Sequence, residues 1–151
     1  MKAHIVSVRE LLLALHKALM DLQRAEHERI HNKRLTPGEL LQLLTGDAAF
    51  DWLHPFSQLI VAIDELEERE VPPTEKDAAA VRLEVERVLT GELYEESIER
   101  DPNVAVAHGR ILAALARLPA PAPDDHESLL ALRPSWRGPR KTRRPGKKPT
   151  N

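Results

Sequence analysis

Two histidines four residues apart, with a glutamate directly after the first, offer a candidate catalytic group. They form the stretch His27-Glu28-Arg29-Ile30-His31. Residues four apart lie on one face of an α-helix, so both imidazoles can bind the same zinc ion. The glutamate between them can act as general base on a water molecule bound to that zinc. His27 and His31 are therefore candidate metal ligands, and Glu28 is a candidate base.

By this H-E-x-x-H pattern the stretch resembles the zincin metallopeptidases over five residues. The resemblance implies zinc as cofactor, His27 and His31 as its ligands and Glu28 as the catalytic base. A catalytic zinc needs a third protein ligand. The extended metzincin pattern would place glycine and histidine where this chain has Arg34 and Pro37. The favoured interpretation is a solvated helix end, where cationic groups complement the helix dipole.

A metal site without hydrolytic chemistry is the alternative for the same histidines. Helical bundles of the hemerythrin kind hold metals with histidines and carboxylates that converge from facing helices. His108 interrupts an otherwise apolar face, and a lone histidine there is more often a hydrogen-bonded core residue than a ligand. His54 precedes Pro55 and can instead satisfy a backbone group freed by that proline. The candidate ligands are His27, His31, His54 and His108.

The C-terminal end of the chain is basic. Residues 133–151 hold eight lysines and arginines and no acidic residue, whereas residues 1–132 hold 14 basic and 24 acidic residues. A flexible basic arm can bind phosphates without sequence preference, and Trp136 can stack on a base. The favoured interpretation is a solubilising tail that also contacts the acidic body. The nucleic-acid candidates are Arg133, Trp136, Arg137, Arg140, Lys141, Arg143, Arg144, Lys147 and Lys148.

Helices must position these residues, because hydrophobic periodicity predicts four long helices and no strand. The first covers about residues 4–32, with apolar side chains every three or four positions. The other three are expected at 55–70, 74–89 and 102–118. Shorter helical segments are expected at 36–46, 48–53, 92–100 and 124–132. Capping residues and prolines mark the helix starts, at Thr36-Pro37, Asp47, Thr74 and Asp101-Pro102.

The segment 50–66 is expected to be the centre of the core. It holds three of the five aromatic residues of the chain and the apolar run Leu59–Ile63. Five apolar residues in a row leave a helix no solvent face over that turn, so this helix must be covered on several sides. The other long helices offer aliphatic or alanine-rich faces, which need a bulky counterpart such as Trp52 or Phe56.

Three segments resemble a group of small bacterial helical proteins to which no chemistry is assigned. They are Leu40–Asp47, Phe50–Glu65 and Asp101–His108, and the likeness covers roughly residues 7–118. The resemblance implies a helical bundle and a bacterial origin, and it implies no activity.

Composition excludes several classes of protein. The chain has no cysteine, which rules out disulfides, iron–sulfur sites and thiol chemistry and favours a cytoplasmic location. No apolar run approaches the roughly 18 residues needed to cross a bilayer. Arg9 and Glu10 interrupt the apolar N-terminal stretch, so we expect neither a membrane partner nor a signal peptide.

We therefore predict an all-α protein, an up-down bundle of four main helices with short helical connectors and a disordered basic C-terminal tail. The expected limits are 1–118 for the bundle, 119–132 for a proline–alanine linker and short helix, and 133–151 for the tail. The favoured function is non-enzymatic, through protein binding or self-association, with no cofactor. The alternatives are a zinc-dependent hydrolase or metal-binding bundle at His27, Glu28 and His31, and a nucleic-acid accessory protein that uses the tail.

Overall fold

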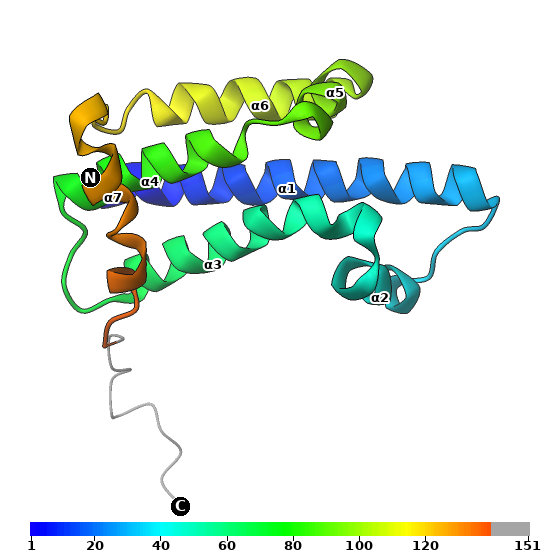
Figure 1. The fold of residues 1–151 in the computed structure, drawn as a ribbon, viewed down its shortest axis with the longest axis horizontal. Coiled ribbons are helices and arrows are strands. Elements are labelled where there is room, and N and C mark those ends of the chain that lie inside the picture. The colour runs from blue at the N-terminus through cyan, green and yellow to red at the C-terminus, as the bar shows by residue number, and fades with distance from the viewer. Residues whose placement is uncertain (140–151) are drawn as a thin grey trace, which may run out of the picture.

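The computed structural model describes residues 1–139 and is all-helical over that range, as predicted (Figure 1). None of these helices has the length and apolarity required to cross a bilayer. The seven α-helices are α1 Lys2–His31, α2 Pro37–Gly46, α3 His54–Glu68, α4 Glu75–Val88, α5 Glu92–Arg100, α6 Pro102–Leu115 and α7 His126–Leu130. The three 3₁₀-helices are η1 Ala48–Leu53, η2 Pro123–Asp125 and η3 Arg133–Trp136. The finer expectation of an up-down four-helix bundle stays a prediction.

Local sequence signals set the helix starts. Thr36 and Glu39 form a capping box at α2, and Thr74 and Asp77 form another at α4. Asp101 caps α6 by accepting a hydrogen bond of 2.8 Å from the backbone N–H of Asn103. These starts confirm the predicted ones, because each depends on residues within three positions of the helix end.

The long helix α1 forms one side of the core. Its side chains at three- and four-residue intervals are completely buried against α3 and α6, as the periodicity predicts. These residues are Ile5, Val8, Leu12, Leu15 and Leu19.

The helix covered on most sides is α4 rather than α3. Between Asp77 and Val85 every side chain is buried except Arg82, which is half-buried. Small alanines at 78–80 let neighbouring elements approach α4 closely. In α3, by contrast, Val61 is 55% exposed within the apolar run that was expected to be enclosed. Phe56 is buried as predicted, and residues 50–66 supply six of the twelve largest fully buried side chains. That this segment is the centre of the core stays a prediction.

The C-terminal part of the described chain folds back over α3 and α4 (Figure 1). Helix α7 packs on α4, and η3 packs on α3. The prediction that a disordered tail begins at Arg133 is wrong for residues 133–136, because they form η3 and bury Trp136 completely. We call residues 133–139 the strap. The remainder of the predicted tail, from residue 140, lies outside the described residues.

Candidate binding groove

The strap is anchored by Trp136. Its indole N–H donates a hydrogen bond of 3.2 Å to Oδ1 of Asp77, whose side chain is also buried. The second oxygen, Oδ2, accepts hydrogen bonds from Arg69 at 2.8 Å and from the backbone N–H of Thr74 at 2.9 Å. Burial opposes ionisation of Asp77, but the hydrogen bonds from Thr74 and Arg69 outweigh it and lower the pKa. Asp77 is therefore a charged anchor for the strap.

Further contacts hold the strap along its length. The backbone N–H of Glu70 donates to the carbonyl oxygen of Pro139 at 3.0 Å. Gly138 lies against the side chain of Arg69, so closely that a Cβ at 138 would stand 2.8 Å from Cγ of Arg69. A side chain at position 138 would therefore force Arg69, which pairs with Asp77, to shift.

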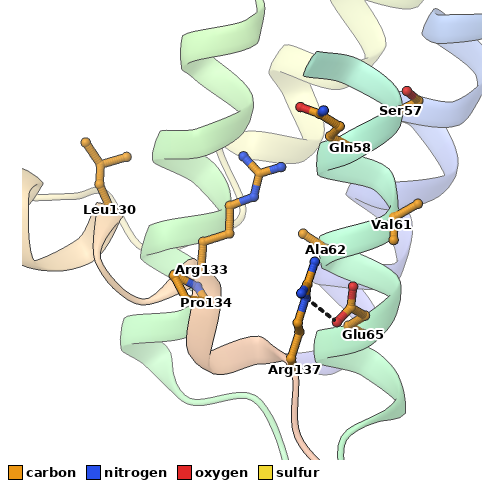
Figure 2. Close-up of a pocket in the computed structure, with 9 residues that line it drawn as sticks. All are labelled: Ser57, Gln58, Val61, Ala62, Glu65, Leu130, Arg133, Pro134 and Arg137. Atoms are coloured by element: carbon orange, nitrogen blue, oxygen red, sulfur yellow. Dashed lines mark ion pairs between the residues drawn. The ribbon is translucent and has the colours of Figure 1, made fainter. Parts of the chain in front are cut away.

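A groove of about 790 Å³ lies between the strap and α3 (Figure 2). Its walls are partly apolar, with Val61 and Ala62 from α3 opposite Leu130 and Pro134. The polar residues that line it are Ser57, Gln58, Glu65, Arg133 and Arg137. Figure 2 shows Arg137 extending from the strap to Glu65 of α3 and Arg133 extending into the space between α4 and α3.

The two arginines keep most of their hydrogen-bonding capacity. Arg133 pairs with the buried carboxylate of Glu84 at 3.5 Å, and Arg137 pairs with Glu65 at 3.3 Å. Within residues 1–139 neither guanidinium makes a hydrogen bond of good geometry, although each carries five N–H donors. The side chain of Arg137 is 83% exposed and that of Arg133 is 32% exposed. Guanidinium groups in this state can bind a carboxylate through two parallel hydrogen bonds.

The H-E-x-x-H stretch has a different role at the C-terminal end of α1. Glu28 accepts hydrogen bonds from the backbone N–H of Leu35 at 2.7 Å and from Arg24 at 3.4 Å. Arg24 also donates to the carbonyl oxygen of Leu35 at 3.2 Å. The hydrogen bond from Leu35 lowers the pKa of Glu28, which is the wrong direction for a general base near neutral pH. Glu28 therefore holds the α1–α2 loop.

The histidines of that stretch do not fit a catalytic zinc site. Their rings stack with centroids 4.1 Å apart, and Nδ1–H of His31 donates to the carbonyl oxygen of His27 at 3.0 Å. Nδ1 of His27 is buried without a hydrogen-bond partner. In the described part of the chain, no three His, Asp or Glu side chains converge closely enough to hold a metal ion. A zinc hydrolase needs such a third ligand.

The other two candidate ligands lie elsewhere and have hydrogen-bond partners. Nε2–H of His54 donates to the carbonyl oxygen of Leu44 at 2.7 Å, near the end of α2. Nδ1 of His108 shares a hydrogen bond of 2.7 Å with the hydroxyl of Tyr94. Burial raises the pKa of Tyr94, so its hydroxyl stays protonated. Both histidines therefore act in holding the fold.

The structure describes three of the nine nucleic-acid candidates. Trp136 is completely buried and cannot stack on a base in this conformation. Arg133 and Arg137 line the groove. The candidates outside the described residues are Arg140, Lys141, Arg143, Arg144, Lys147 and Lys148.

Sequence reasoning missed the α3 side of this groove. Ser57 and Gln58 lie on a helix that was predicted correctly, but nothing in their spacing marks them as groove residues. One available signal was Trp136 itself, because a large apolar ring is costly to leave in water.

Comparison with known proteins found no match among family models, curated sequences or solved structures.

Proposed function

We propose that the protein is a binding module that holds a carboxylate-bearing segment of a partner protein in the groove between α3 and the strap. The observation that carries the proposal is the pair of arginines, Arg133 and Arg137, whose free N–H donors line a partly apolar groove. Guanidinium groups suit planar carboxylates, and the apolar walls suit aliphatic side chains next to them. A volume of about 790 Å³ lies within the range of ligand clefts, roughly 300–1,000 Å³.

A peptide suits this groove better than a nucleic acid does. Val61 and Ala62 offer apolar surface, which a phosphate backbone does not use. Trp136, the aromatic residue that could have stacked on a base, is buried.

The test is a titration of the full chain, labelled with ¹⁵N, with a twelve-residue peptide of alternating glutamate and leucine pairs. Because the groove contacts few partner side chains, we expect a dissociation constant on the order of 1–100 µM. Amide resonances of Val61, Ala62 and Leu130 should shift. A peptide with glutamine in place of glutamate should bind more weakly, because the charge-assisted hydrogen bonds are lost.

Arg137→Gln should weaken peptide binding about three- to fivefold, as expected for an exposed ion pair. The matched control is Arg110→Gln, since Arg110 is an exposed arginine of α6 away from the groove. Equal binding of the glutamate and glutamine peptides, or tighter binding of a twelve-nucleotide single strand that shifts no groove resonance, would reject the proposal in favour of the basic tail.

A further inference from the structure

Helix α5 carries an unpartnered acidic face. Its four glutamates at 92, 95, 96 and 99 are all exposed, and their spacing places them on one side of the helix. Among residues 1–139 none of the four carboxylates has an ion-pair or hydrogen-bond partner. Leu93, beside them, is 52% exposed. The opposite side, with Tyr94 and Ser97, is buried in the protein. The outer surface of α5 is thus a short amphipathic helix with carboxylates next to an exposed leucine.

This face matches what the groove requires. The groove offers Arg137 and Arg133 as cations and Val61, itself 55% exposed, as apolar surface. Within one chain, Arg133 and the start of α5, at Glu92 and Leu93, line a second pocket, but Arg133 pairs there with Glu84 of α4. No described ion pair joins α5 to the strap, so the two complementary surfaces do not satisfy each other within one chain.

We propose that α5 of a second copy of this chain occupies the groove, so that copies associate head to tail. The inference rests on the proposed function, since it names the partner of the same groove. A contact between two different surfaces is heterologous, and each added copy leaves one free groove and one free α5. The assembly therefore either closes into a ring or continues to grow with concentration. The charges are exposed and screened by ions, so association weakens as salt rises.

The experiment is sedimentation velocity on the full chain, between about 10 µM and 1 mM, at low and high salt. The average mass should rise with concentration at low salt and fall toward the monomer at about 0.5 M salt, where the Debye length is only about 4 Å. Glu95→Lys combined with Glu99→Lys should remove association. Arg137→Glu alone should do the same, because the groove then repels α5.

Combining the three substitutions in one chain should restore association, since lysines on α5 then face a glutamate in the groove. The charge-matched control is Glu10→Lys with Asp21→Lys, two exposed acids of α1 without described ion pairs. It should associate like the parent chain. The indole N–H resonance of Trp136 checks that the strap remains docked in each variant.

The outcomes separate this inference from the proposed function. A chain that stays monomeric at 1 mM and low salt, yet binds the glutamate–leucine peptide in the groove, refutes the inference alone. Association that survives either charge reversal refutes it too, because other surfaces then make the contact. A monomeric chain that binds no acidic peptide rejects both.

Discussion

Replacing Trp136 with alanine tests the strap, on which the groove depends. The indole is completely buried, and a large aromatic side chain removes about 150–250 Å² from water. At about 25 cal/mol per Å² this burial is worth roughly 4–6 kcal/mol. Measured truncations of buried tryptophan or phenylalanine to alanine cost about 3–5 kcal/mol. We expect Trp136→Ala to lower the free energy of unfolding by about 3–5 kcal/mol. The loss cannot exceed the free energy with which the strap docks, because the strap detaches once that is lost.

Trp136→Phe separates packing from the hydrogen bond. Phenylalanine keeps most of the ring volume but cannot donate to Asp77, which retains its bonds from Arg69 and Thr74. The expected loss is about 1–2 kcal/mol, because the acceptor is charged but still partnered. The phenylalanine variant should therefore lie between the parent and the alanine variant.

Urea denaturation followed by circular dichroism measures these differences, and hydrogen exchange of residues 133–139 reports the strap directly. In Trp136→Ala the strap amides should exchange much faster, while those of α1 remain protected. An alanine variant as stable as the parent, with unchanged exchange in the strap, would refute the packing described for Trp136 and with it the wall of the groove.

Three further predictions concern the core, pH dependence and the α1–α2 loop. Phe56→Ala should cost about 3–5 kcal/mol in urea denaturation, since Phe56 is buried, and a stability equal to the parent's would contradict its place in the core. The pKa of Asp77 is lowered in the folded state, so its contribution is complete above about pH 4, its ordinary value, and is lost as pH falls through the folded-state pKa. Between pH 6 and pH 3 the free energy of unfolding should therefore fall less in Asp77→Asn than in the parent. An equal fall in both proteins would show that Asp77 does not cause the pH dependence. Glu28→Ala should lower the free energy of unfolding and speed exchange of the Leu35 amide, whereas His31→Ala should leave that exchange unchanged. The reverse order would show that Glu28 does not hold the α1–α2 loop.

The elements that sequence predicts well are those set by nearby residues. Thr36 and Thr74 mark helix starts because each cap is completed three residues later. The burial of α4 was harder to predict. Its alanines and the valines on one of its faces occur both in helices at the surface of a protein and in helices enclosed by it. The difference is made by the elements that cover α4 from other parts of the chain.

The candidate site was only half predictable for the same reason. The sequence identifies Arg133 and Arg137 as cations, but its content of proline, glycine and like charges predicts that they lie in a disordered tail. The contact that brings them to α3 joins Trp136 to Asp77, 59 positions away in the sequence. Hydrophobic periodicity depends on neighbouring residues, so it cannot predict a contact between such distant ones. The sequence marks Asp77 as the residue that completes the capping box of Thr74, and the structure confirms this. Nothing in the sequence marks its second role as the acceptor for the indole of Trp136. The H-E-x-x-H spacing correctly places the rings of His27 and His31 side by side. The side chain of Glu28, however, is oriented by its hydrogen bond to Leu35 in the loop that follows, and the spacing does not predict that bond.

The sharing of Asp77 among three partners has a consequence for local unfolding. If the strap detaches, the carboxylate keeps Arg69 and Thr74, so no bare charge is left in the core. The opened state therefore avoids the usual penalty for an unpaired buried ion, and its free energy lies below that of global unfolding. Because the strap is held by one buried ring and by a few hydrogen bonds and ion pairs, we expect it to detach before the contacts among α1, α3 and α6 break. The protein should then visit a strap-open form, in which the C-terminal wall of the groove is missing while the helical core remains intact.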